Sequence, residues 1–155
     1  MAMMNDSPRR VFIDNNILIY ATQETAPWNP EARRALQAFE EAGSELWLSR
    51  QVLREYIAAL SRPQTYATPL DTETIVQRVR LFQQIFHVAD DTAEVTSRLL
   101  ALLTERPAGG KQVHDANVAA TMLAYDIDAL LTANVADFRR FEGLFTLLPL
   151  TDETP

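Results

Sequence analysis

Short apolar runs alternate along the chain with longer amphipathic stretches, and this alternation predicts the secondary structure. The runs with the character of buried strands are residues 10–14, 45–48, 86–89, 129–132 and 145–148. Helical periodicity or helix-end signals occur between them, at residues 15–20, 30–42, 50–62, 71–82, 92–103 and 116–125. Because strands separated by helices need crossover connections, the pattern predicts a three-layer α/β domain with a mostly parallel central sheet flanked by helices.

Residues typical of helix ends support these boundaries. Pro30 lies near the start of one helical stretch and Gly43 just past its end, while Ser49 is suited to cap the next helix. Residues 64–70 are a turn-rich connection. The glycine-containing loop 106–112 precedes Asp115, which we expect to cap the helix that begins at residue 116.

The amino-acid composition limits the cellular compartments and the kinds of site that fit this protein. The 155 residues include no cysteine, which excludes disulfides, thiolate metal ligands and thiol catalysis, and fits the cytoplasm. Residues 1–10 lack the apolar run of a signal peptide, and no segment has the ~20 apolar residues of a membrane span, so no membrane association is expected. With no repeat or linker, we expect a single domain over residues 1–155, with its core at about 10–149.

The charge balance is acidic, with 21 acidic and 14 basic residues. This argues against a polyanionic partner held by bulk charge. Arginines close to a site could still form a local phosphate-binding rim, although a general bias toward arginine would give the same composition.

Four acids lie just after predicted strands or near the starts of neighbouring helices, and ligands of open α/β sheets bind at the carboxyl ends of the strands. Asp14 ends the first strand, and Glu55 lies one turn into the helix after the second. Asp115 follows the glycine-containing loop, and Asp137 follows the strand that ends at Thr132. We therefore expect the four carboxylates to reach one edge of the sheet.

Each acid also has a structural interpretation. Asp115 could act as an N-cap, which is compatible with a ligand role because a cap uses only one carboxylate oxygen. Asp137 could cap the turn 138–141, and Glu55 could pair with a neighbouring arginine on the surface. Asp14 differs from these, because a charged side chain that continues a buried strand needs a partner to offset its desolvation.

If the four carboxylates converge, they must bind a cation or take up protons. Two carboxylates ~4 Å apart repel by about 4 kcal/mol at an effective dielectric constant of 20. The chain has one lysine and no thiol, so a hard cation with oxygen ligands, Mg²⁺ or Mn²⁺, is the natural partner. Such a site suits metal-assisted hydrolysis of a phosphodiester.

The two histidines are too few for a zinc site with three nitrogen or sulfur ligands. His114 adjoins Asp115 and could contact substrate, or it could be an ordinary surface residue. We expect His87, in an apolar strand, to be structural.

Four segments resemble the motifs of the PIN-domain ribonuclease family, and in particular of VapC-type toxins, in the same order along nearly the whole chain. They are residues 11–21 (VFIDNNILIYA), 49–56 (SRQVLREY), 113–120 (VHDANVAA) and 131–138 (LTANVADF). The resemblance implies an endoribonuclease that cleaves RNA with Mg²⁺ or Mn²⁺. It also implies a cognate VapB-like antitoxin that blocks the site, and a homodimer.

The resemblance further implies roles for individual residues. Core metal ligands would be Asp14, Glu55 and Asp115, with Asp137 completing the catalytic acids, and the supporting residues would be Asn16, Thr132 and Asn134. Family members often have threonine or serine at the position of Asn15, and some have aspartate at that of Asn134. Neither departure removes one of the four carboxylates, but Asn134 supplies no carboxylate for a second metal position. The arginines nearest the motifs are candidates for holding the RNA backbone: Arg50, Arg54, Arg139 and Arg140.

Two other functions compete with this one. A phosphatase of the haloacid dehalogenase type would use the aspartate after the first strand as nucleophile, but it needs a second aspartate two residues later, where this chain has Asn16. A catalytically silent PIN-like module would bind RNA or a protein without cutting it. The four acids argue against that module, because a dead site need not keep clustered charges.

Overall fold

The central strand of the sheet is buried over most of its length. In the computed structural model, which describes residues 7–64 and 67–151, β1 (Arg10–Ile13) lies in the middle of a five-stranded sheet of order β3-β2-β1-β4-β5. Val11, Phe12 and Ile13 are fully buried, as expected for a strand covered on both faces. All neighbouring strands run parallel, so the sheet expected to be mostly parallel is entirely parallel.

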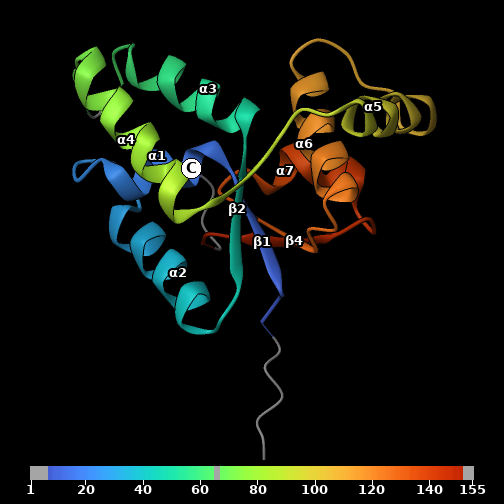
Figure 1. The fold of residues 1–155 in the computed structure, drawn as a ribbon, viewed down its shortest axis with the longest axis horizontal. Coiled ribbons are helices and arrows are strands. Elements are labelled where there is room, and N and C mark those ends of the chain that lie inside the picture. Colours follow the sequence, from blue (N-terminus) through green and yellow to red (C-terminus); the bar gives the residue numbers. More distant parts are fainter. Residues whose placement is uncertain (1–6, 65–66, 152–155) are drawn as a thin grey trace, which may run out of the picture.

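The predicted alternation of strands and helices is confirmed. The remaining strands are β2 (Glu45–Ser49), β3 (His87–Ala89), β4 (Ala129–Thr132) and β5 (Thr146–Pro149). The helices are α1 (Asn15–Thr22), α2 (Asn29–Glu41), α3 (Arg50–Leu60), α4 (Thr72–Ile85), α5 (Ala93–Glu105), α6 (Gln112–Ala124) and α7 (Val135–Phe138), followed by the 3₁₀ turn η1 (Arg139–Phe141). Figure 1 shows α1, α2 and α4 on one side of the sheet and α5, α6 and α7 on the other.

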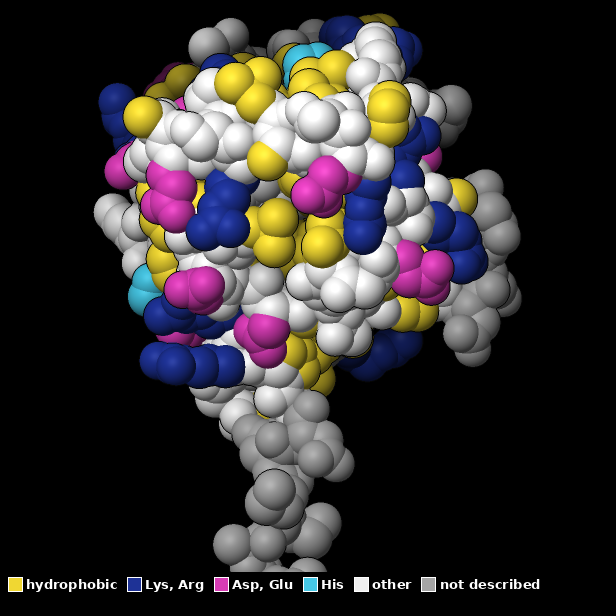
Figure 2. Space-filling view, turned by 90° about the vertical axis from the view of Figure 1, so that its right-hand side faces the viewer, with side chains coloured by type: hydrophobic (Ala, Val, Ile, Leu, Met, Phe, Trp, Pro, Cys, Tyr) yellow, Lys and Arg dark blue, Asp and Glu magenta, His cyan; other side chains and the backbone are white. Residues whose placement is uncertain are grey.

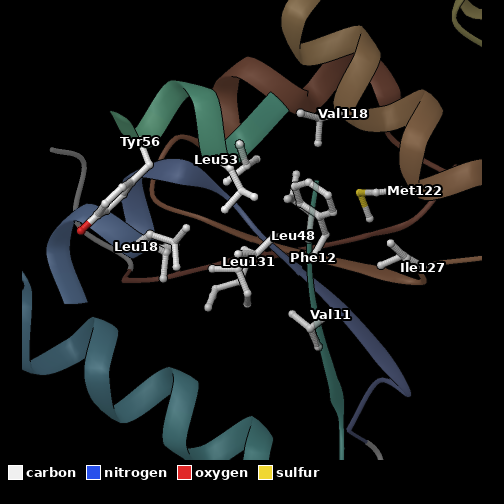
Figure 3. Close-up of a cluster of buried hydrophobic side chains, with 14 of the residues drawn as sticks. Val11, Phe12, Leu18, Leu48, Leu53, Tyr56, Val118, Met122, Ile127 and Leu131 are labelled. Atoms are coloured by element: carbon white, nitrogen blue, oxygen red, sulfur yellow. The ribbon is translucent and has the colours of Figure 1, made fainter. Parts of the chain in front are cut away.

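Side chains from the helices meet the sheet in one apolar core. Figure 3 shows Leu53 of α3 with Val118 and Met122 of α6 around Phe12 of β1. Phe12 and Met122 are fully buried, and truncating a buried phenylalanine to alanine costs about 3–5 kcal/mol. Because Phe12 lies two residues before Asp14, this packing fixes the position of the end of β1.

Side-chain caps begin several helices, as their sequences indicate. The Ser49 hydroxyl accepts a hydrogen bond from the Val52 amide, and Asp71 and Thr92 cap α4 and α5 in the same way. These caps satisfy amide groups that have no partner within the helix.

The start of α6 corrects one prediction. The helix begins at Gln112, four residues before the predicted start, so Asp115 lies inside its first turn and does not cap it. Turn hydrogen bonds from the Gln112 and Val113 amides to the carbonyls of Gly109 and Gly110 begin the helix in place of a side-chain cap. The Asp115 carboxylate is therefore not tied to the helix N-terminus.

Two predictions made from the sequence concern segments that the structure describes only in part. They are the absence of a signal peptide, which concerns residues 1–10, and the turn-rich connection 64–70, of which residues 65 and 66 are not described. Gln64 and Ala67 form an isolated antiparallel bridge within that connection. None of the helices in residues 7–64 and 67–151 combines the length and hydropathy of a membrane span.

Candidate metal centre at the carboxyl edge of the sheet

Strand register places Asp14 beside the end of β4. Ile13 is paired with Leu131, and the Asp14 amide donates to the Leu131 carbonyl at 3.1 Å. The residue after Leu131 is Thr132, which is completely buried. Two segments more than 100 residues apart in sequence thus meet at this edge.

The Asp14 carboxylate has the partners that its burial requires. Its Oδ1 accepts from the Asn15 amide at 2.8 Å, which caps α1. Its Oδ2 accepts from the Thr132 hydroxyl at 2.7 Å and from Asn16 Nδ2 at 3.2 Å. The expectation that a charge at the end of a buried strand needs compensation is confirmed.

The three residues predicted to support the site lie around Asp14. Asn16 Oδ1 accepts from the Ala133 amide at 3.2 Å, so the Asn16 side chain bridges α1 and the end of β4. The Thr132 hydroxyl accepts from the Asn134 amide at 3.0 Å while it donates to Asp14. Asn134 therefore contributes through its backbone, and its exposed side chain makes no cap hydrogen bond to α7.

Glu55 is half-buried on α3, and among the described residues it forms no ion pair with an arginine. Its Oε1 accepts from Gln51 Nε2 at 2.7 Å, one helical turn earlier. The neighbouring arginines bind other acids: Arg50 pairs with Asp90 at 3.0 Å, and Arg54 with Asp91 at 3.3 Å. The surface ion pair considered for Glu55 is thus replaced by a neutral amide contact.

Asp115 and Asp137 belong to α6 and α7, on the side of the sheet opposite α1, α2 and α4. Asp115 is half-buried in the first turn of α6, and Asp137 is exposed within α7. Asp137 does not cap the turn that follows, because it lies inside α7 itself. The helices α6 and α7 are in contact, which brings the two acids toward the same edge.

The negative charges of these acids affect the pKa values of their neighbours. The pKa of Asp14 is raised from 3.8 to about 6, mainly by burial and also by the negative charges of Glu55 and Asp115, against the hydrogen bonds from Thr132 and Asn15 that lower it. Burial also raises the pKa of Asp115 to about 6, together with the charges of Asp137 and Glu55. Repulsion among carboxylates is thus a feature of the folded chain.

Cationic groups offset only part of this repulsion. His114 and Arg140 lower the pKa of Asp115, but burial and the neighbouring acids outweigh them. Arg140 is held by Gln112 Oε1 at 2.9 Å. His114 is exposed, next to Asp115 in α6. His87 stacks on Trp47, with ring centroids 4.9 Å apart, and is exposed at the start of β3.

The donor set fits a hard cation by its chemistry. It consists of oxygen atoms from carboxylates, and its repulsion is the kind that a divalent cation relieves. Asn15, the residue after Asp14, has a buried side-chain amide oxygen, Oδ1, without a hydrogen-bond partner among the described residues. In the part of the chain that the structure describes, no three acids or histidines lie close enough together to hold one ion. Binding of a cation therefore requires the side chains to change rotamer and converge.

Two residues near these acids are not among those predicted from the sequence to form the site. Gln51 contacts Glu55, and burial, together with the negative charge of Asp14, raises the pKa of Tyr20. The spacing of Gln51 and Glu55, four positions apart on a helix, is a signal available in the sequence. The proximity of Tyr20 to Asp14 depends on the turn between β1 and α1.

Comparison with known proteins agrees with this architecture. The family model of the PIN domain matches residues 11–144. No curated protein sequence gives a significant match. Among solved structures, VapBC2 from Rickettsia felis bound to a promoter DNA fragment gives a TM-score of 0.68 at 19% identity, covering 90% of this chain and 98% of that chain.

Two further structures share the fold. A toxin-antitoxin complex from Klebsiella pneumoniae gives a TM-score of 0.65 at 21% identity, covering 92% of this chain and 99% of that one. VapC20 from Mycobacterium tuberculosis, a toxin that cleaves the sarcin-ricin loop, gives 0.58 at 15% identity, covering 77% and 86%. Since the family model spans most of the sequence and the fold agrees with it, this chain belongs to the PIN domain family.

Proposed function

We propose that this protein is an endoribonuclease that depends on Mg²⁺ or Mn²⁺, and that it is the toxin of a VapBC-type toxin-antitoxin pair. The observation that carries the proposal is the raised pKa of Asp14 and Asp115, for which burial is the largest cause and neighbouring carboxylates add to it: Glu55 and Asp115 act on Asp14, and Asp137 and Glu55 act on Asp115. A fold without a use for these charges would be more stable with neutral side chains there. Membership of the PIN domain family supports a nuclease.

The catalytic acids would be Asp14, Glu55, Asp115 and Asp137, which would also hold the metal. A divalent cation bound there supplies Lewis-acid chemistry toward water and a phosphodiester and offsets the carboxylate charge. The chain orients these acids through neutral donors: Thr132 and Asn16 hold Asp14, and the Asn134 amide in turn holds the Thr132 hydroxyl. Neutral donors fix the direction of a carboxylate without cancelling the charge that attracts the cation.

Arginines near the edge would hold the RNA backbone. Arg140 acts electrostatically on Asp115, and Arg139 is exposed beside it in η1. Arg50 and Arg54 already pair with Asp90 and Asp91, so RNA would have to compete with those acids for them. Arg139 and Arg140 are therefore the stronger candidates of the four.

The same proposal includes a cytoplasmic protein with a VapB-like antitoxin partner and a homodimeric state. Similarity to structures of toxin-antitoxin complexes supports the partner. Large hydrophobic side chains exposed on α3, α4 and α5 offer apolar surface for protein contacts: Ile57, Val76, Leu81, Ile85 and Leu100. Figure 2 shows hydrophobic side chains gathered between charged ones on the face that includes α5 and α6.

One observation favours the competing function, a PIN-like module that binds RNA or a protein without cutting it. Among the described residues, the acids do not stand in positions from which three of them could hold one ion. The two functions differ in whether a cation draws these side chains together, and this is measurable.

A cleavage assay with matched variants separates the two functions. Wild-type protein, Asp14→Asn and Asp71→Asn are each incubated with a structured RNA in Mn²⁺, in Mg²⁺ and in EDTA. Asp71 is the control, because it is an exposed helix cap far in sequence from the site acids. We expect cleavage by wild type and Asp71→Asn only with a cation, and a loss in Asp14→Asn greater than the roughly 100-fold typical of outer-shell changes.

The assay also identifies the competing function. Binding of the RNA without cleavage, together with no carboxylate-dependent Mn²⁺ affinity in calorimetry, would establish the silent module. Equal cleavage by wild type and Asp14→Asn would indicate a contaminating nuclease and remove the support for this site.

A further inference from the structure

Gln51 connects the two helices that carry Glu55 and Asp115. It lies in the first turn of α3 and is only 6% exposed. Its Nε2 donates to Glu55 Oε1 at 2.7 Å and to the His114 carbonyl at 2.9 Å, and its Oε1 accepts from Asn117 Nδ2 at 2.8 Å. Since His114 and Asn117 flank Asp115 along α6, one side chain contacts both acid-bearing turns.

The three contacts determine the orientation of the Gln51 amide. Both partners of Nε2, a carboxylate and a backbone carbonyl, accept hydrogen bonds and cannot donate them, so the nitrogen must face them. The oxygen then faces the Asn117 amide group. With both N–H groups and the oxygen engaged, the side chain has one arrangement that satisfies all its partners.

The link matters because the two helices belong to different parts of the fold. α3 packs against α1, α4 and β2, whereas α6 packs chiefly against α5. Across the described part of the chain, the hydrogen bonds between α3 and α6 both involve Gln51. Without them, repulsion between Glu55 and Asp115 would favour rotamers that move the carboxylates apart into solvent.

A neutral amide suits this position better than a charged group. A lysine or arginine here would also hold Glu55 and a carbonyl, but it would place a positive charge where a cation has to bind. Gln51 orients Oε1 of Glu55 and leaves the net charge of the acids unchanged. This is the arrangement expected of a group that acts on a metal site through its ligands.

We propose that Gln51 is a positioning residue that keeps the helical turns of Glu55 and Asp115 next to each other, so that both carboxylates can converge on one divalent cation. The proposal deepens the function proposed above and rests on it. Gln51 itself would contact neither the cation nor the RNA.

A comparison of two glutamine variants tests the proposal. Gln51→Met keeps the length of the side chain and removes its hydrogen bonds. Gln37→Met is the matched control, because Gln37 also donates to a glutamate four residues later, Glu41 at 2.9 Å, but on the exposed surface of α2. Both variants and wild type are studied in the full-length protein at one temperature.

Two measurements are made on each protein. In EDTA, hydrogen exchange is expected to become faster in residues 112–118 of Gln51→Met and to stay unchanged there in Gln37→Met. In calorimetry, the Mn²⁺ affinity of Gln51→Met is expected to fall about 10- to 100-fold, the range typical of lost outer-shell contacts, with Gln37→Met equal to wild type. A purely structural role would lower the melting temperature without changing Mn²⁺ affinity in the folded protein.

A second variant covers the possibility that Gln51→Met folds poorly. Asn117→Ala removes one partner of Gln51 and introduces the residue most favourable to a helix. It should lower Mn²⁺ affinity in the same direction, by less than Gln51→Met does.

The outcomes distinguish this proposal from the proposed function. If wild type binds Mn²⁺ through its acids and Gln51→Met and Asn117→Ala bind it equally well, the positioning role is wrong while the nuclease stands. If wild type shows no Mn²⁺ binding that depends on Asp14, the proposed function fails and the role of Gln51 fails with it.

Discussion

Replacing Asp14 by asparagine should stabilise the metal-free protein at neutral pH. The pKa of Asp14 is raised from 3.8 to about 6 on folding. When the pKa of a carboxyl is higher in the folded than in the unfolded protein, its ionisation lowers the free energy of unfolding. This destabilisation is absent below pH ~4, grows as the pH rises, and is complete above pH ~6. A shift of about 2 pH units corresponds to about 3 kcal/mol.

The asparagine side chain introduced by Asp14→Asn would escape this penalty and lose part of the present hydrogen bonding. Its amide oxygen can keep the bond from the Asn15 amide, while its amide nitrogen would face Thr132 and Asn16, which now donate to Asp14. The rearrangement costs about 1 kcal/mol. The net gain is about 2 kcal/mol, or roughly 4–8 °C in melting temperature for a domain of this size.

Thermal unfolding followed by circular dichroism in EDTA measures this gain at about pH 7.5 and about pH 4.5, on either side of the raised pKa. The difference between Asp14→Asn and wild type should be large at the higher pH and should narrow at the lower one, where the carboxyl is protonated in the folded state. Asp71→Asn is the control of opposite sign, since hydrogen bonds from Thr74 lower the pKa of Asp71 and ionisation there favours folding. An Asp14→Asn protein no more stable than wild type at the higher pH would refute this account of the site.

Two further predictions concern the same edge of the sheet. Because protons compete with a cation for Asp14 and Asp115, whose pKa values are about 6, Mn²⁺ affinity measured by calorimetry should rise between about pH 5 and about pH 7 and then level off; a flat profile would contradict cation binding by these acids. Thr132→Val, which removes the hydroxyl that donates to Asp14, should lower the free energy of unfolding at neutral pH by about 1.5–3 kcal/mol in urea titration. Thr121→Val, which removes a bond within α6, should cost less, and an equal cost would argue against a special role for Thr132.

The fold could be predicted from the sequence because its strands are short apolar runs with distinct ends. Residues 10–13 and 129–132 are apolar almost throughout, as strands buried on both faces must be, and both appear where expected. The acids could be selected because they lie just after such strands or near the starts of neighbouring helices. The parallel register then brings Asp14 beside Thr132. No local pattern in the sequence indicates that β1 and β4 are neighbours; this pairing follows only from the predicted fold.

The parts that could not be predicted depend on local geometry or on contacts between distant residues. The sequence pattern places the start of α6 too late because an aspartate after a glycine loop is typical of a cap, whereas turn bonds to Gly109 and Gly110 begin the helix. The partners of Arg50 and Arg54 lie 40 and 37 residues away, on the segment after β3. Neither arrangement leaves a periodic signal in the sequence.

The contact between Asp14 and Thr132 has a consequence for the order of events during synthesis. The hydroxyl that holds Asp14 follows it by 118 residues, and β1 needs β4 as a neighbour on one side. A nascent chain therefore cannot assemble this edge until Thr132 has left the ribosome. Chains whose synthesis stops before β4 carry Asp14 without the hydroxyl that orients it.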